Sequence, residues 1–173
     1  DQTGCIRADV MSNPELTSGL LERYAARLPS TKGRRCWVTD KRPDNAFYAG
    51  IILASFPNAK VIYMVRNAAE TCLSLYSQSF DPNISYARSF EAACHHLELT
   101  HNVMMHWRSM FADRIKQVRY EDLVHSPDST LRDICAFLDI TCESRMLDFT
   151  NRTGRVQTAS LWQIREPLHS RSI

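Results

Sequence analysis

Arg66 and Ser74, eight positions apart, are the two residues whose types and spacing most clearly suggest chemistry. Arg66 follows the β-branched, apolar run 60–65, where a strand buried on both faces is expected to end and a helix to begin. A helix N-terminus offers unpaired N–H groups, and a guanidinium adds a forked donor that suits phosphate. Ser74 then falls roughly two turns along that helix. From spacing alone, however, the plainer interpretation is favoured, in which Arg66 forms a salt bridge and Ser74 only packs.

Two more polar segments follow expected strands. Lys41 comes after the short apolar segment 36–39, and Tyr120-Glu121-Asp122 comes at the end of a later strand. Parallel sheets bind ligands beyond the carboxyl ends of their strands, which singles out these positions together with the one after run 60–65. Taken alone, Lys41 is an ordinary solvated loop residue. Glu121 and Asp122 are expected to cap the helix that follows or to pair with a nearby Arg, and a general-base role for either is disfavoured.

The elements that must position these residues alternate along the chain. Hydrophobic period and the placement of Pro, Gly and Asn predict helices and strands in turn. Such alternation indicates the α/β class, with a parallel sheet flanked by helices on both faces, in a single domain over residues 1–173. The predicted strands are 36–39, 60–65 and 115–120, and the predicted helices are 13–32, 46–56, 68–79, 89–110 and 126–138.

Composition excludes several classes of protein. The chain has 173 residues, 44% hydrophobic and 23% charged, which is ordinary for a globular domain. A net charge of +2 is too small to favour a nucleic-acid partner. There is no apolar run long enough to cross a bilayer and no signal peptide. Because no initiator Met is present, we expect a longer gene product; the expected compartment is the cytoplasm, or the Golgi lumen if a targeting segment lies upstream.

Neither the cysteines nor the histidines predict a metal site. No two of the six cysteines form a C-x-x-C pair, which argues against a zinc ribbon or a thioredoxin motif. Those in helical segments are expected to be buried free thiols, whereas a disulfide that involves any of the other three stays open. Four histidines of helix 89–110 either point to different faces or lie about 16 Å apart along it. The helical cysteines are Cys72, Cys94 and Cys135, the others are Cys5, Cys36 and Cys142, and the histidines are His95, His96, His101 and His106.

The segment from Phe56 to Tyr76 resembles the 3′-phosphate-binding segment of sulfotransferases that use 3′-phosphoadenosine 5′-phosphosulfate (PAPS). In that family an apolar strand ends in Arg, and a Ser follows eight residues later. The resemblance therefore implies that Arg66 and Ser74 bind the 3′-phosphate. Phe80 extends the likeness to the bacterial tetratricopeptide-linked and protein-tyrosine sulfotransferase branch, which implies tyrosine, in a protein or peptide, as the hydroxyl acceptor.

The resemblance also assigns roles to three other residues. Lys41 would face the transferred sulfuryl group and stabilise the charge that develops on its oxygens. Tyr120 would contact the adenine, by stacking and hydrogen bonding. Ser160 would donate a hydrogen bond to the sulfuryl group, with Thr158 as a weaker substitute. Small-molecule sulfotransferases carry a catalytic His where this chain has Pro43, which favours the protein-tyrosine-like branch, whose base is an upstream Glu.

Two parts of the family's pattern are not found in the sequence. No Gly-rich loop that could cradle the 5′-phosphosulfate is present, and the Glu base is expected in the same region, so the fold is expected to be P-loop-like and truncated at its N-terminus. The leading hypothesis is an enzyme that transfers a sulfuryl group from PAPS without a metal and releases adenosine 3′,5′-bisphosphate (PAP). The alternative is a non-catalytic chain that keeps only the 3′-phosphate half of the nucleotide site. A related kinase is disfavoured, because no Walker-type loop is present. The sequence does not indicate the oligomeric state.

Overall fold

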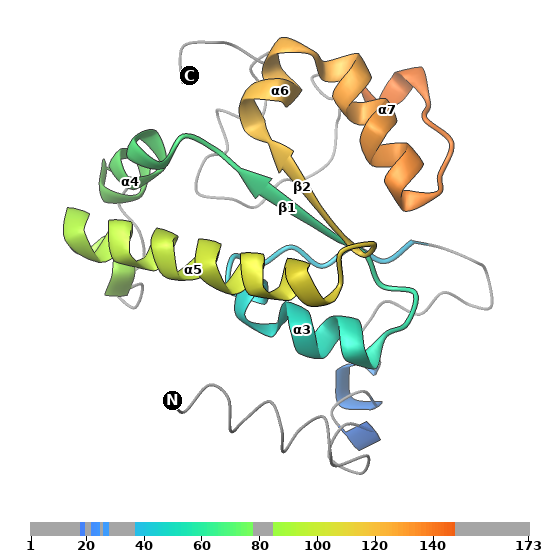
Figure 1. Ribbon diagram of the computed structural model, residues 1–173, viewed down its shortest axis with the longest axis horizontal. Coiled ribbons are helices and arrows are strands. Elements are labelled where there is room, and N and C mark those ends of the chain that lie inside the picture. Colours follow the sequence, from blue (N-terminus) through green and yellow to red (C-terminus); the bar gives the residue numbers. More distant parts are fainter. Residues whose placement is uncertain (1–17, 20–21, 25, 28–36, 78–84, 148–173) are drawn as a thin grey trace. The chain divides into compact units, whose positions relative to one another are not determined.

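The computed structural model describes residues 18–19, 22–24, 26–27, 37–77 and 85–147 (Figure 1). The chain divides into two compact units, the first ending at Ala59 and the second beginning at Lys60. The single domain expected over residues 1–173 stays a prediction.

The first unit contains helix α3, Asn45–Ser55. The turn at Pro43–Asp44 precedes it, and its end comes just before Pro57, a residue that disfavours helical geometry in the position ahead of it. Ala49, Gly50 and Leu53 are buried, which gives the helix one inward-facing stripe. The helix predicted over residues 46–56 is therefore confirmed, with a shift of one position.

The short strand predicted over residues 36–39 is wrong for the part that the structure describes. Residues 37–42 have no regular secondary structure, and Cys36 lies outside the described residues. Trp37 is 64% exposed and Val38 is 38% exposed. A strand must pair its backbone groups with a neighbour, and among the described residues none pairs with this segment. Apolar, β-branched composition alone is therefore insufficient to make this segment a strand.

The second unit is built on two parallel strands. β1, Val61–Val65, pairs with β2, Ile115–Arg119, in a register that runs from Val61↔Ile115 to Val65↔Arg119. The connection between them contains helix α4, Ala68–Ser77, the short turn η1, Ser85–Ala87, and the long helix α5, Phe90–Met110. After β2 the chain forms α6, Tyr120–His125, α7, Pro127–Leu138, and η2, Ser144–Met146. The expected α/β class with a parallel sheet is confirmed, and both strands end at the same edge (Figure 1).

Helices cover both faces of this sheet. Tyr63 turns toward α5, where its hydroxyl lies 3.4 Å from Nδ1 of His101. Lys116, on the opposite face by the alternation of strand side chains, pairs with Asp133 of α7 at 2.7 Å. The Lys116 ammonium also lies 5.7 Å from the centre of the Phe137 ring. The predicted arrangement of helices on the two faces is thus confirmed.

The expectation that β1 is buried on both faces is wrong. Ile62 and Met64 share one face and are 39% and 43% exposed. Helix α7 contacts β2 on that face, where Val118 is only 5% exposed. The β-branched run satisfies the pattern of a buried strand, yet within the second unit α7 is placed over β2 rather than over β1.

The two longest helices of the unit have clear start and stop signals. Ser89 caps α5 by accepting the backbone N–H of Ala92 at 3.1 Å, and α7 begins at Pro127. Helix α7 ends at Leu138, and its C-cap Asp139 has a φ of 59°, in the left-handed region. The expectation of free thiols is confirmed for the described cysteines of these helices and α4: Cys72 and Cys135 are buried, and Cys94 is half-buried. Cys142 is also a free thiol, so the disulfide left open for it does not form, and Cys5 and Cys36 lie outside the described residues.

Candidate functional site

The turn between β1 and α4 is organised by Asn67. Its side-chain oxygen accepts the backbone N–H of Glu70 at 3.1 Å, and its carbonyl accepts the N–H and the hydroxyl of Thr71 at 3.0 and 2.8 Å. Asn67 is thus the N-cap of α4, and it satisfies a donor that would otherwise lack a partner. The cap fixes the direction in which the chain leaves Arg66.

Within the described part of the chain, α4 and the start of α6 both contact the Arg66 guanidinium. From α4, one carboxylate oxygen of Glu70 accepts Nη2 at 3.0 Å and Nε at 3.3 Å. From the start of α6, the Tyr120 ring lies beneath the guanidinium, with Cζ 5.2 Å from the ring centre. The salt bridge that spacing favoured for Arg66 is therefore present, and the ends of the two strands meet through the Arg66–Tyr120 contact.

Ser74 lies on the helix face to which Arg66 reaches. Glu70 and Ser74 are four residues apart, so they are about 40° apart around the helix and about 6 Å apart along it. Because Glu70 holds the guanidinium, the cation and the Ser74 hydroxyl belong to the same side of α4. Ser74 is half-buried. One face of α4 therefore presents a cation and, one turn later, a hydroxyl.

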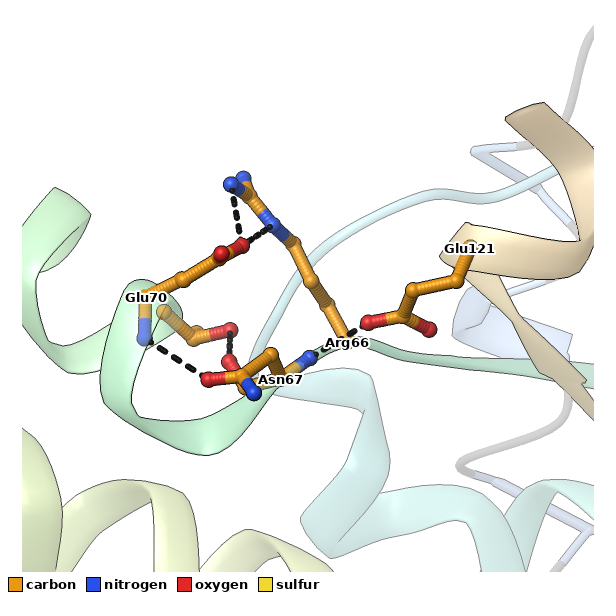
Figure 2. A network of polar contacts seen from close by, with 5 residues as sticks. Arg66, Asn67, Glu70 and Glu121 are labelled. Carbon is orange, nitrogen blue, oxygen red and sulfur yellow. Dashed lines mark hydrogen bonds and ion pairs between the residues drawn. The ribbon is translucent and has the colours of Figure 1, made fainter. Parts of the chain in front are cut away.

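Glu121 joins the two strand ends a second time. Its carboxylate accepts the backbone N–H of Asn67 at 2.7 Å, across 54 positions of sequence (Figure 2). It also lies 3.6 Å from Nε of Arg119, and its side chain is only 14% exposed. Its own backbone N–H, then that of Asn67, and more weakly Arg119 lower the pKa of Glu121 against the effect of burial. The predicted pairing of Glu121 with a nearby Arg is confirmed, with Arg119 as the partner.

These contacts change the expected position of a phosphate. The sequence suggested unpaired N–H groups at the start of α4, but Glu121 binds the N–H of Asn67, and Asn67 binds that of Glu70 (Figure 2). Carboxylate and amide oxygens already satisfy these two donors. An anion at this edge is therefore expected beside Arg66 and Ser74, farther along α4.

Comparison with known proteins identifies the family of the chain. Residues 6–144 match the sulfotransferase family. The chain belongs to the sulfotransferase family. It is 30% identical over 127 residues to a protein-tyrosine sulfotransferase of Drosophila melanogaster, which covers 69% of this chain and 25% of that protein. It is also 29% identical over 161 residues to an uncharacterized protein of Aquifex aeolicus (strain VF5), covering 91% of this chain and 21% of that one.

A solved structure supports the same assignment. The sulfotransferase domain from the curacin biosynthetic pathway superimposes with a TM-score of 0.51 and 26% identity, over 62% of this chain and 40% of that one. This chain spans about a quarter or less of the length of the two curated relatives. The resemblance inferred from the residues is thus confirmed at the level of the sulfotransferase family and its α/β fold.

Lys41, Ser160 and Thr158 are the other residues that the sequence assigned to the site. Lys41 is exposed and belongs to the first unit, next to Asp40, which accepts the Tyr24 hydroxyl at 2.8 Å. Burial, and then the Asp40 carboxylate, raise the pKa of Tyr24. Ser160 and its substitute Thr158 lie outside the described residues. The structure brings together Arg66 and Tyr120, with Ser74 on the same helix face as the Arg66 partner, and the roles of Lys41 and Ser160 stay predictions.

Sequence reasoning missed Glu70 and Asn67. The pattern Asn67-Ala-Ala-Glu70 has the spacing of a capping box, so it could have identified Asn67 as a cap. No local pattern could have indicated that Glu121 would bind the N–H of Asn67, because that contact depends on the parallel pairing of β1 with β2.

An open groove of about 610 Å³ runs along β2 and α7, apart from this cluster. It is not lined by Arg66, Ser74 or Tyr120. The residues that line the groove are Arg108, Gln117, Val118, Arg119, Asp122, Ser126, Ser129, Thr130 and Asp133.

The described residues show neither a metal site nor a membrane span. Within the described ranges, no group of three or more His, Cys, Asp or Glu side chains is suited to a metal ion. In the same part of the chain, no helix has the length and apolar character needed to cross a bilayer.

Proposed function

We propose that this sulfotransferase chain binds PAPS, and the product PAP, with the 3′-phosphate on Arg66 and Ser74. The observation that carries the proposal is the Arg66 guanidinium, held at the carboxyl end of β1 by Glu70 and Tyr120 on the helix face that leads to Ser74. A guanidinium has five N–H donors in a planar fork, a geometry that matches the oxygens of a phosphate. Two oxygens of the 3′-phosphate can accept hydrogen bonds from the guanidinium, and the Ser74 hydroxyl, one helical turn away, can donate to the third.

Tyr120 supports the adenine end of the same ligand. Its ring is half-buried at the first position of α6 and lies under Arg66. An aromatic ring at this place can stack with a purine while its hydroxyl donates or accepts a hydrogen bond. The Arg66 guanidinium carbon lies 5.2 Å from the centre of the Tyr120 ring, so a single nucleotide can contact both side chains.

The proposed reaction is sulfuryl transfer from PAPS to a hydroxyl, with protein tyrosine as the acceptor. The acceptor oxygen forms a bond to sulfur, the bond from sulfur to the 5′-phosphate oxygen breaks, PAP leaves, and a base takes the acceptor's proton. Lys41 is proposed to stabilise the charge that develops on the sulfuryl and bridging oxygens, and Ser160 to donate to the sulfuryl group. Tyrosine as the acceptor is supported by the similarity to the Drosophila protein-tyrosine sulfotransferase.

Calorimetry with PAP tests the proposed phosphate site. Arg66→Ala should weaken PAP binding by at least about 1.5 kcal/mol, the lower end for a hydrogen bond to a charged group. The same substitution should leave binding of adenosine 5′-monophosphate unchanged, because that ligand lacks the 3′-phosphate. Arg132→Ala is the matched control, since Arg132 forms an i,i+4 ion pair with Asp128 on α7. Equal PAP affinities of wild type and Arg66→Ala would refute the site.

A turnover assay separates transfer from binding. The narrower alternative, a chain that binds the nucleotide without transferring sulfate, is favoured by one sequence observation: the 173 residues contain no G-x-x-x-x-G-K-[ST] loop. Incubation with radiolabelled PAPS and a tyrosine-containing peptide should transfer the label if the chain is catalytic, and Lys41→Ala should slow that transfer. PAP binding without any transfer would establish the binding-only function.

A further inference from the structure

The cap of α4 departs from the usual pattern in one respect. In a capping box, the acidic residue three positions after the N-cap returns to bind the N-cap's own backbone N–H. Asn67 and Glu70 have this spacing, but the Glu70 carboxylate turns to Arg66 instead. The N–H of Asn67 is bound by Glu121, which comes from the end of the other strand (Figure 2). A contact that is ordinarily local is here made between two separate elements.

Glu121 is well suited to this long-range contact. A carboxylate oxygen of Glu121 lies 2.7 Å from the Asn67 backbone nitrogen, and only 14% of the Glu121 side chain is exposed to solvent. The carboxylate also meets the positive end of α4, which favours negative charge at this position. The hydrogen bonds from the backbone N–H groups of Glu121 and Asn67 lower the pKa of Glu121, so they favour its ionised form. The contact is therefore a charge-assisted hydrogen bond, roughly twice as strong as a neutral one.

Glu121 and Tyr120 are neighbours in sequence, and each contacts the turn that carries the phosphate-binding residues. The Tyr120 ring contacts Arg66, and the Glu121 carboxylate binds the next residue, Asn67. The start of α6 therefore makes two contacts with two consecutive residues at the end of β1. Without the Glu121 contact, the turn would be tied to the start of α6 by the contact of Arg66 with Tyr120 alone.

We propose that Glu121 is a positioning residue, which holds Arg66 at the distance from Tyr120 that an adenosine bearing a 3′-phosphate requires. This inference rests on the proposed function. Glu121 touches neither the adenine nor the phosphate; it acts through the backbone of Asn67. It makes the site selective for 3′-phosphorylated adenosine over adenosine 5′-monophosphate, because only the former contacts both strand ends.

The test compares three substitutions of Glu121 by calorimetry with PAP. Glu121→Ala removes the acceptor, Glu121→Asp shortens its reach by one methylene, and Glu121→Gln keeps an oxygen at the same distance. PAP affinity should fall about fivefold in Glu121→Ala and Glu121→Asp, the equivalent of one net hydrogen bond, and less than about twofold in Glu121→Gln. Affinity for adenosine 5′-monophosphate should stay within about twofold in all three, since that ligand makes no use of the Arg66 position.

A second arm of the experiment shows whether Glu121 acts through Arg66. In an Arg66→Ala background, Glu121→Ala should have almost no further effect on PAP affinity. Unchanged PAP affinity in both Glu121→Ala and Glu121→Asp would overturn the inference, as would a loss in Glu121→Gln as large as in Glu121→Ala. Should Glu121→Ala fail to fold, the Asp and Gln variants still decide the question. Failure of the proposed function is distinct, because then Arg66→Ala itself leaves PAP affinity unchanged.

Discussion

Replacing Tyr120 by Leu should uncouple Arg66 from α6. The guanidinium carbon lies 5.2 Å from the ring centre, within the range of a cation–π contact. The Arg66 side chain is 28% exposed, so the contact is partly solvated, and we expect it to contribute about 0.5–1 kcal/mol. Leu keeps apolar bulk at the position but has no ring, whereas Phe keeps the ring and loses only the hydroxyl.

A double-mutant cycle in chemical denaturation measures this energy. Wild type, Tyr120→Leu, Arg66→Met and the double variant give the coupling free energy between the two side chains, and Arg66→Met keeps most of the apolar stem. We expect a coupling of about 0.5–1 kcal/mol, and no loss of coupling when Phe replaces Tyr120. A coupling indistinguishable from zero would refute the claim that Tyr120 holds the guanidinium.

The same variants separate two contributions of Tyr120 to ligand binding. If the ring also stacks with adenine, Tyr120→Leu should weaken PAP binding by about 1–3 kcal/mol, more than the contact with Arg66 can explain. Binding of adenosine 5′-monophosphate should weaken as well, because that ligand carries the same base. A PAP affinity reduced only by the coupling energy would restrict Tyr120 to holding Arg66.

Three further outcomes follow from burial, capping and charge. Met104 is 1% exposed, so Met104→Ala should cost about 2–5 kcal/mol of unfolding free energy, whereas Met105→Ala, at a position 38% exposed, should cost far less in the same urea titration. Ser89→Ala removes the N-cap of α5 and should lower the free energy of unfolding by about 1 kcal/mol. Ser109→Ala removes an exposed hydroxyl in the last turn of α5 and should leave that free energy almost unchanged. Thermal unfolding of both variants measures the difference. The folded-state pKa of Glu121 lies below its ordinary value of 4.5, so its contribution to stability is present above that pH and is lost as the pH falls through the folded-state pKa. Glu121→Gln should therefore flatten the acid side of the stability curve, and an unchanged acid slope would contradict the lowered pKa.

The parts of the fold that were predictable are those with strong local signals. The run 60–65 is apolar and β-branched, and it forms β1, which pairs in parallel with the predicted later strand, β2. The helix that begins after Ser89 has a serine cap and a long hydrophobic period, and it forms within one or two residues of its expected bounds. These signals reside in neighbouring residues, so tertiary structure had little to change.

Other predictions failed because tertiary structure decides them. The segment at Trp37 has the composition of a strand, but a strand also requires a partner, and composition carries no information about one. The exposure of Ile62 and Met64 depends on where α7 packs, which the pattern of β1 does not encode. Burial on both faces was therefore beyond what the alternation of a single strand can indicate.

For the candidate site too, the sequence predicts local features but not the contacts made between the two strands. The position of Arg66 at a strand end and the distance to Ser74 along a helix follow from local geometry and could be predicted. The meeting of Arg66 with Tyr120, and of Asn67 with Glu121, depends on the register Val65↔Arg119. Register is set by the whole packing of the unit, so the contacts that organise the site became visible only in the structure.

Phosphorus NMR of PAP tests the central claim most directly, because the 3′- and 5′-phosphorus atoms give separate resonances. On titration with the 173-residue chain, we predict that the 3′ resonance shifts and broadens, and that Arg66→Ala abolishes this change while Arg132→Ala preserves it. A titration in which only the 5′ resonance responds, or in which Arg66→Ala responds as wild type does, would contradict the assignment of Arg66 to the 3′-phosphate.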